Sequence, residues 1–123
     1  MNRKEGQLRQ YDYVGHMVEA IRLIDSYLEG TEYEAFVNDR RTQQAVIFNL
    51  LVIGEAATKV GNEYPEWAEK HSGIPWRSMR GMRNRLAHGY FEIDLSIVWD
   101  TAQTAFKGLE DDLLKIMQDR PTT

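Results

Sequence analysis

Apolar side chains recur at intervals of three and four residues near both ends of the chain, and this spacing constrains the fold more than any other feature. It is typical of an amphipathic helix, because residues three and four apart share one helical face. In the first segment, from Leu8 to Leu28, the pattern comprises Tyr11, Val14, Val18, Ile21, Ile24 and Leu28. In the last segment it comprises Val98, Ala102, Ala105, Phe106, Leu109, Leu113, Ile116 and Met117. The sequence therefore predicts one long helix near each end.

A third segment, residues 45–57, reads AVIFNLLVIGEAA and is apolar nearly all round. The residues that interrupt it are Asn49, Gly54 and Glu55. Because the segment is too short to cross a bilayer, we interpret it as a buried core helix at the centre of the fold. Asn38 or Asp39 can cap this helix, and the sequence GNEYP should end it at about Val60.

Glycine and proline divide the rest of the chain into shorter helices. Gly30 is the expected stop of the first helix, and Thr31 is the expected N-cap of a short helix over residues 32–37. A second short helix is expected near residues 66–70, before a turn that contains glycine and proline.

Pro75 suits the start of a further helix at about Trp76, because proline is favoured at the first helical position. That helix should end near His88, since Gly89 is a suitable residue just past a helix end. The following YFEIDL alternates too briefly to predict a strand. The predicted fold class is therefore all-α, an up-and-down bundle of about four main helices plus short connecting helices, in a single domain spanning residues 1–123.

The composition is that of a globular domain, with 42% hydrophobic and 28% charged residues. The absence of cysteine excludes disulfides, thiolate catalysis and zinc sites built on sulfur. Neither a signal peptide nor a membrane span is predicted, so we expect a cytoplasmic protein with no membrane association. The net charge of −4 argues against a protein that coats nucleic acid over its whole surface, but it allows a local basic site.

Arginine is concentrated in one segment of this acidic chain. Nine residues without Asp or Glu contain Arg77, Arg80, Arg83 and Arg85. Asn84 and His88 are four apart and share a helical face. A helix that ends at His88 could let Tyr90 fold back toward Arg83, which would bring a guanidinium, an amide, an imidazole and a phenol together. A structural role is the alternative, because basic residues favour the negative C-terminal end of a helix and tyrosine often packs there.

Three segments together resemble the HepT family of minimal HEPN-domain proteins: RNRLAHGYF at 83–91, IPWRSMRGM just before it, and LLVIGEAATKV on the central helix. The HepT motif is an Arg, four residues, a His, one residue and a Tyr, with a polar residue after the Arg. Arg83, His88 and Tyr90 occupy these positions, and Asn84 is the polar residue. The resemblance extends from the first helix to the last, and it implies a HEPN-type bundle.

The resemblance also implies a function. It is that of a metal-independent endoribonuclease without cofactors, acting as the toxin of a type VII-like toxin–antitoxin pair. The implied partner is an MntA-type nucleotidyltransferase, which silences the toxin by adding AMP to the motif tyrosine, here Tyr90. Some HEPN proteins only bind nucleotides or act as scaffolds, so a non-catalytic nucleotide-binding or protein-interaction module is the alternative. A purely structural helical adaptor is a third interpretation.

The motif residues suit cleavage of RNA by its own 2′-hydroxyl, which needs a base, an acid and stabilisation of charge at phosphorus. We expect His88 to transfer protons, Arg83 to bind phosphate oxygens, and Asn84 to orient the histidine or the phosphate. The residues expected to hold flanking RNA phosphates are Arg77, Arg80 and Arg85. One motif histidine per chain is too few for an acid and a base, and the central helix looks too apolar to be covered within one chain. We therefore expect a homodimer with facing motifs, or a higher oligomer with the antitoxin.

Several residues outside the motif carry further expectations. His16 should pack or be partly exposed and His71 should be solvated, because neither has a basic cluster beside it in sequence. Glu55 lies in the apolar central helix and should form a structural salt bridge with a motif arginine. The tryptophans interpreted as core or interface anchors are Trp67, Trp76 and Trp99.

Overall fold

The computed structural model describes residues 9–121, which form helices and no strand. The long helices are α2 (Arg9–Leu28), α4 (Arg40–Glu63), α6 (Trp76–His88) and α8 (Phe106–Gln118). The shorter elements are α3 (Tyr33–Val37), α5 (Pro65–Lys70), a 3₁₀ turn η1 (Tyr90–Glu92), α7 (Leu95–Asp100) and a π-helical turn η2 (Thr101–Ala105). The predicted all-α bundle with about four main helices and short connecting helices is confirmed.

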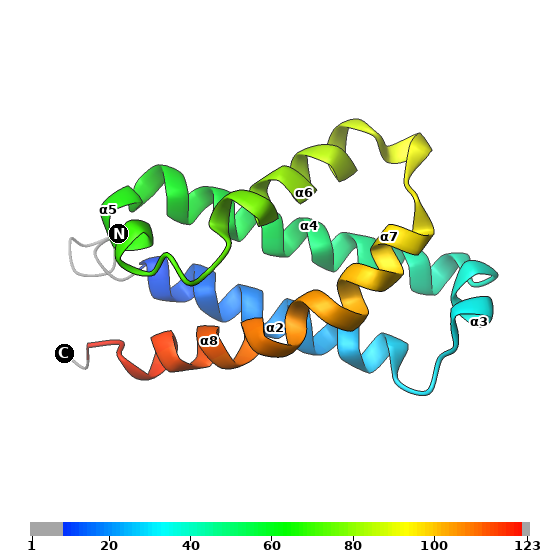
Figure 1. Cartoon of the computed structure of the whole chain (residues 1–123), viewed down its shortest axis with the longest axis horizontal. Coiled ribbons are helices and arrows are strands. Elements are labelled where there is room, and N and C mark those ends of the chain that lie inside the picture. The colour runs from blue at the N-terminus through cyan, green and yellow to red at the C-terminus, as the bar shows by residue number, and fades with distance from the viewer. Residues whose placement is uncertain (1–8, 122–123) are drawn as a thin grey trace.

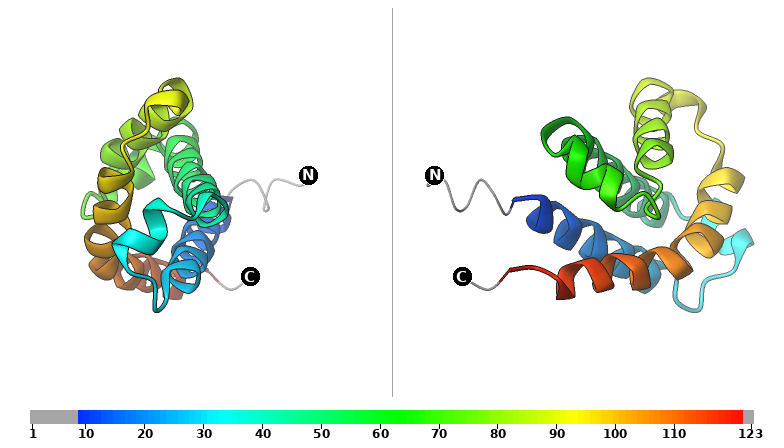
Figure 2. Two further views of the ribbon diagram at one scale, coloured as in Figure 1. Left: turned by 90° about the vertical axis from the view of Figure 1, so that its right-hand side faces the viewer. Right: turned by 60° about the vertical axis from the view of Figure 1, so that its left-hand side comes forward.

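The main helices pack in the spatial order α6, α4, α2, α8 (Figures 1 and 2). Helix α4 contacts both α2 and α6, and α2 also contacts α8. The segment η1–α7–η2 forms an arch that joins the end of α6 to the start of α8 (Figure 1). The central position predicted for α4 is therefore confirmed.

Helix α4 is buried on most of its surface, as its apolar sequence predicts. Its buried residues include Val46, Leu50, Ile53, Ala57 and Val60. One side of the helix remains uncovered, where Phe48 is 63% exposed and Leu51 and Val52 are half-buried. Over residues 9–121, none of the helices has the length and apolarity needed to span a membrane.

The apolar stripes of α2 and α8 form most of the remaining core. All of the residues that define the α2 stripe are buried, namely Tyr11, Val14, Val18, Ile21, Ile24 and Leu28. The prediction for the last stripe was wrong at Ala105, which is exposed, and Met117 is only half-buried. Ala105 lies in η2, and a π-helical turn holds more residues than an α-helical turn. Each residue therefore rotates less about the axis, and Phe106 rather than Ala105 returns to the core.

Helix boundaries follow local capping chemistry. Asp39 caps α4, because its carboxylate accepts hydrogen bonds from Thr42 N at 3.2 Å and Thr42 Oγ1 at 2.6 Å. These hydrogen bonds hold the pKa of Asp39 below its usual value. Gly30 ends α2 with a φ of +71°, a left-handed conformation that favours glycine. The predicted N-cap at Asp39 and the predicted helix end at Gly30 are therefore confirmed.

Two predicted boundaries were wrong. Glu32, not Thr31, occupies the N-cap of α3, and it makes no side-chain capping bond. Helix α4 continues past Val60 to Glu63, because a single glycine does not break a helix that is packed on both sides. It ends at Tyr64, whose position before Pro65 disfavours α-helical geometry.

Candidate functional site

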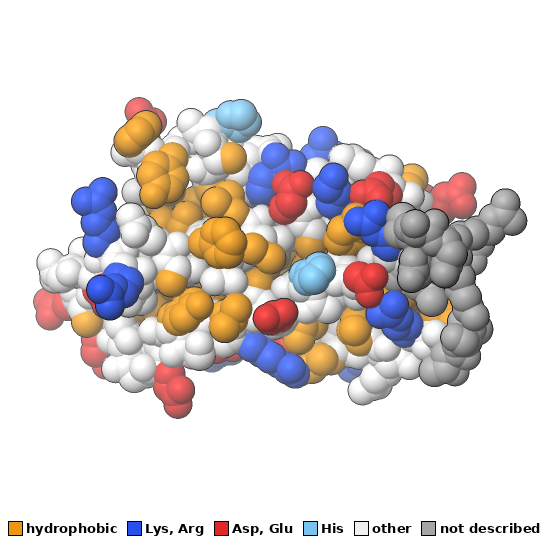
Figure 3. Space-filling view, turned by 180° about the vertical axis from the view of Figure 1, so that it is seen from behind, with side chains coloured by type: hydrophobic (Ala, Val, Ile, Leu, Met, Phe, Trp, Pro, Cys, Tyr) orange, Lys and Arg blue, Asp and Glu red, His pale blue; other side chains and the backbone are white. Residues whose placement is uncertain are grey.

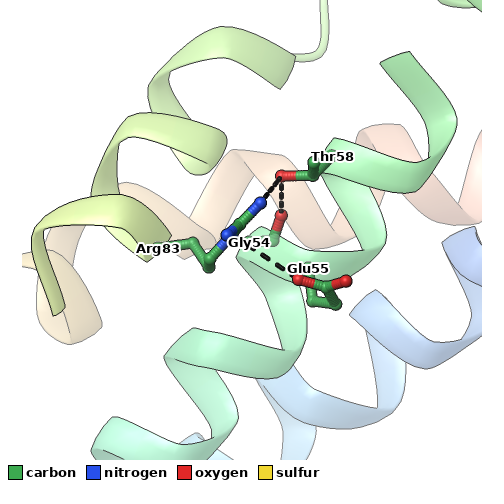
Figure 4. A network of polar contacts seen from close by, with 4 residues as sticks. All are labelled: Gly54, Glu55, Thr58 and Arg83. Carbon is green, nitrogen blue, oxygen red and sulfur yellow. Dashed lines mark hydrogen bonds and ion pairs between the residues drawn. The ribbon is translucent and has the colours of Figure 1, made fainter. Parts of the chain in front are cut away.

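Arg83 lies where α6 crosses α4, and its guanidinium is held by two side chains of α4 (Figure 4). Its Nη2 donates a hydrogen bond to Thr58 Oγ1 at 3.2 Å, and Thr58 Oγ1 in turn donates to the Gly54 carbonyl at 2.8 Å. Its Nε lies 3.5 Å from Glu55 Oε2, which is an ion pair. The predicted salt bridge between Glu55 and a motif arginine is therefore confirmed.

Gly54 allows this close crossing, because it has no Cβ. A Cβ at this position would lie 2.8 Å from the Met79 carbonyl oxygen and well inside van der Waals contact with Arg83 Cβ. Gly54 itself is buried. The backbones of α4 and α6 can thus approach at the point where Arg83 leaves α6, and the stem of its side chain lies directly on α4.

Arg83 lines a surface groove formed by α2, α4 and α6, which we call the Arg83 groove. Its charged lining residues are Arg9, Glu55, Lys59, Glu63 and Arg83, and its other lining residues include Tyr13, His16, Phe48, Leu51 and Val52. Figure 3 shows hydrophobic and charged side chains side by side on the face opposite to that of Figure 1. The groove therefore combines exposed apolar surface with the motif guanidinium.

His88 and Asn84 lie on a different side of α6 from Arg83. At about 100° per residue, Arg83 and His88 are separated by about 140° around the helix, whereas Asn84 and His88 share a face. His88 is exposed and Asn84 is half-buried. Over residues 9–121 no hydrogen bond or ion pair joins Arg83 to His88. One chain alone therefore does not bring its motif guanidinium and imidazole into contact.

Tyr90 begins η1, immediately after the end of α6. Its side chain is 51% exposed, and its ring packs edge-on against Phe91 with the centroids 5.8 Å apart. Phe91 is almost fully exposed. Gly89, between His88 and Tyr90, donates its N–H to the Arg85 carbonyl at 2.8 Å and closes the helix. The phenol is thus accessible from solvent at the C-terminal end of α6.

The other arginines of α6 face separate hollows. Arg77 and Arg80 line a pocket between α4, α5 and α6, and Arg85 lines a mostly apolar pocket formed by α4, α6, α8 and the arch. Glu92 and Asp94 also line the Arg85 pocket. The pKa of Asp94 is lowered, chiefly because its carboxylate accepts hydrogen bonds from the Ser96 hydroxyl and the Ser96 N–H. The four arginines are therefore divided among three surfaces of α6.

The histidines outside the motif differ from each other. The expectation that His71 is solvated was wrong, because its Nδ1 lies 2.8 Å from the Trp67 carbonyl oxygen and its ring packs on the Trp67 ring at 4.3 Å. His16 is exposed and lines the Arg83 groove. Trp76 is a core anchor, as expected, and its indole N–H bonds two backbone carbonyls at 3.1 Å.

Gly54 and Thr58 are site residues that sequence reasoning missed. A glycine in the middle of a long helix is unfavourable by about 1 kcal/mol relative to alanine, so it signals a packing reason. Thr58 lies four residues further along and thus on the same face of α4. Within residues 9–121, no three His, Asp or Glu side chains are grouped so that they could hold a metal ion.

The fold and the motif define a class, an all-α bundle that carries Arg-x₄-His-x-Tyr at the end of a helix crossing the central one. The family model described as "Ribonuclease HepT-like" matches residues 17–116. The chain belongs to the HepT-like ribonuclease family, and the resemblance noted in the sequence is confirmed.

Named relatives agree with this membership. "Probable ribonuclease HepT" from Thermococcus cleftensis is 36% identical over 105 residues, which cover 85% of this chain and 93% of that protein. A "Putative RNase" from Caldanaerobacter subterraneus subsp. tengcongensis is 34% identical over 106 residues, which cover 86% and 92%. A "Gamma-glutamylcyclotransferase and putative RNase" from Methanocaldococcus jannaschii is 34% identical over 107 residues, which cover 87% of this chain and 47% of that protein. No solved structure matched the chain.

Proposed function

We propose that this protein is a metal-independent endoribonuclease toxin, with its active site shared between two chains of a homodimer. The observation that carries the proposal is Arg83, a motif arginine that lines the Arg83 groove and is held there by α4. Its Nε is buried and has no hydrogen-bond partner among residues 9–121. The guanidinium therefore retains N–H donors for a phosphodiester. Membership of the HepT-like ribonuclease family supports the choice of RNA as substrate.

The proposed chemistry is attack of a 2′-hydroxyl on the adjacent phosphorus. An imidazole takes the proton of the 2′-hydroxyl, the 2′-oxygen bonds to phosphorus, and the bond from phosphorus to the 5′-oxygen breaks. A second imidazole, in its protonated form, gives a proton to the leaving 5′-oxygen. Arg83 stabilises the charge that develops on the phosphate oxygens, and Asn84 orients His88. The products are a 2′,3′-cyclic phosphate end and a 5′-hydroxyl end.

The exposed apolar side of α4 supports the homodimer. Phe48, Leu51 and Val52 lie in the same groove as Arg83, so a second copy that covers this groove would bury apolar surface and approach the guanidinium. The separation of about 140° between Arg83 and His88 on one helix also favours a site that takes His88 from the other chain. Two chains then supply the two imidazoles.

Mixing the parent with an inactive variant tests the shared site. Arg83→Ala and His88→Ala chains should each fail to cleave RNA in the presence of EDTA. When parent and His88→Ala chains are unfolded and refolded together in equal amounts, about a quarter of the dimers contain two parental chains and so both imidazoles. Activity should then be about a quarter of that of the same total amount of parent, against about half if each chain carried a complete site. Arg22→Ala is the matched control, since Arg22 pairs with Glu110 on a surface remote from the motif and its loss should leave cleavage unchanged. Retention of half of the activity would contradict the shared site.

The remaining arginines have a weaker role in this proposal. Arg77, Arg80 and Arg85 contact phosphates that flank the cleaved bond. Replacing any of them with alanine should weaken RNA binding and leave the rate of the chemical step unchanged. The slope of log binding constant against log salt concentration should become shallower by about one. Fluorescence anisotropy with labelled RNA at several salt concentrations measures this slope.

Regulation by a partner is part of the same proposal. An MntA-type nucleotidyltransferase transfers AMP from ATP to the Tyr90 hydroxyl, which gives up its proton as pyrophosphate leaves. The exposure of this phenol supports its access to an enzyme. The bulk and negative charge of AMP at the end of α6 would then exclude RNA. Intact mass spectrometry of the chain co-expressed with such an enzyme should show adenylylated Tyr90, and Tyr90→Phe should escape silencing. Complete silencing of Tyr90→Phe would contradict covalent control at this tyrosine.

A non-catalytic nucleotide-binding module is the second candidate, because Arg83 retains N–H donors for a nucleotide phosphate without any contact to His88 within one chain. Such a module would bind ATP or GTP saturably in calorimetry and leave RNA intact. In that case the Arg83→Ala variant would lose nucleotide binding.

A further inference from the structure

Thr58 holds Arg83 through a hydroxyl whose own orientation is fixed. The Thr58 side chain is buried in α4, and its O–H donates to the carbonyl of Gly54, four residues earlier. A hydroxyl has one hydrogen to donate, so its lone pairs are left to accept. One of them accepts from Arg83 Nη2 at 3.2 Å. The hydroxyl thus acts as a rigid acceptor for one edge of the guanidinium (Figure 4).

The stem of Arg83 is fixed as well. Its Cβ and Cγ lie against Gly54, where even a methyl group would not fit. An arginine side chain otherwise loses much rotamer freedom when it is ordered. Because α4 holds both the stem and Nη2, this conformational freedom is already lost when the chain folds. The guanidinium is therefore preorganised before a substrate binds.

Glu55 contacts Arg83 differently. Its carboxylate is 3.5 Å from Arg83 Nε, too loosely placed for a hydrogen bond, and its side chain is 54% exposed, compared with 26% for Arg83. An exposed ion pair contributes little and can exchange partners. A phosphodiester oxygen can therefore replace Glu55 beside Nε, whereas Thr58 has no route out of the helix interface.

We infer that Thr58 is a positioning residue for RNA cleavage: it keeps Arg83 aimed into the groove while a phosphodiester replaces Glu55 as the anionic partner. This inference rests on the proposed function, because it assigns Thr58 an effect on the transition state that Arg83 stabilises. It concerns the hydroxyl alone, so the methyl group of Thr58 should be dispensable.

Thr58→Val and Thr58→Ser separate the hydroxyl from the shape of the side chain. Thr58→Val should lower kcat about tenfold with KM little changed, because an Arg83 that is no longer held in place stabilises the transition state less. Thr58→Ser should retain most of kcat. Thr104→Val is the matched control, since the Thr104 hydroxyl also donates to a carbonyl four residues earlier, at 2.7 Å, but within residues 9–121 it accepts no hydrogen bond from an arginine. An equal loss in Thr58→Ser and Thr58→Val, or no loss in Thr58→Val, would overturn the inference.

A second readout does not depend on catalysis. Nitrogen-15 NMR of the Arg83 guanidinium should show slow rotation about Nε–Cζ in the parent and in Thr58→Ser, and averaged Nη signals in Thr58→Val. Averaged signals in the parent would overturn the inference. If none of the chains cleaves RNA but the NMR contrast is present, the proposed function fails while the positioning of Arg83 by Thr58 stands.

Discussion

Replacing Gly54 with alanine should push α6 away from α4 at the point where the two helices cross. The added Cβ would lie 2.8 Å from the Met79 carbonyl oxygen, against about 3.4 Å for an ordinary C···O contact, and it would also overlap the stem of Arg83. Neither neighbour is the flexible end of a side chain. Helix α6 must therefore move away from α4, or both helices must bend.

The magnitude follows from two opposing effects. Overpacking of a tight core contact destabilises by about 1–3 kcal/mol, and contact with backbone places Gly54→Ala near the upper value. Alanine offsets about 1 kcal/mol, because it favours helix over glycine. The expected net loss in the free energy of unfolding is about 2 kcal/mol, which corresponds to a fall in Tm of about 8 °C for a chain of this size. Since Arg83 moves with α6, RNA cleavage should fall by about 100-fold.

Gly61→Ala is the control for this prediction. Gly61 lies in the same helix, and a Cβ there would meet no atom within 4 Å. The alanine should therefore raise stability by up to about 1 kcal/mol and leave cleavage unchanged. Thermal and urea unfolding followed by circular dichroism measure both variants. If Gly54→Ala is as stable as Gly61→Ala, the close crossing of α4 and α6 does not govern stability, and the reasoning is refuted.

Three further variants test interactions away from this crossing. Trp76→Phe removes an indole N–H that bonds two carbonyls at 3.1 Å, so urea unfolding should show a loss of about 2 kcal/mol. The pKa values of Asp39 and Asp94 are lowered by capping hydrogen bonds, so their stabilisation is present above the ordinary pKa of 3.8 and is lost as the pH falls through the folded-state values. In the double variant Asp39→Asn/Asp94→Asn, the free energy of unfolding should fall less steeply as the pH is lowered below 3.8. An unchanged pH dependence would contradict the stabilising role given to these two carboxylates. Desolvation raises the pKa of Asp25, so Asp25→Asn should raise stability at pH 7 relative to the parent and the gain should disappear in acid.

Much of the fold could be predicted because its signals are local. The α2 stripe, the Asp39 cap and the Gly30 stop each depend on residues within a few positions of one another. The errors concern features that local pattern does not encode. Helix α4 passes through a glycine because tertiary packing supports it, and the π-helical turn shifts the apolar face beside Ala105.

The candidate site was less predictable, because its parts come from two helices far apart in the sequence. The motif spacing placed Arg83 and His88 on α6, and a carboxylate in an apolar run indicated that Glu55 needs a partner. The hydrogen bond from Arg83 to Thr58 joins residues 25 positions apart, and no local pattern selects that pair. The division of the four arginines among three pockets likewise depends on how α6 is rotated against its neighbours.

The rotation of α6 distinguishes Arg83 from arginines of the same type close by in sequence. Arg80 and Arg85 lie three residues before it and two residues after it, yet within residues 9–121 no hydrogen bond or ion pair joins either of them to α4. Gly54 makes room for Arg83, because a Cβ at this position would overlap the stem of the arginine whose guanidinium donates to Thr58. A chain that kept the Arg-x₄-His-x-Tyr motif but carried a larger residue in place of Gly54 would retain the spacing and lose the anchored arginine. In a helical bundle of this kind, the motif together with a glycine and a hydroxyl residue four positions apart on the central helix is therefore a stronger indication of a formed site than the motif alone.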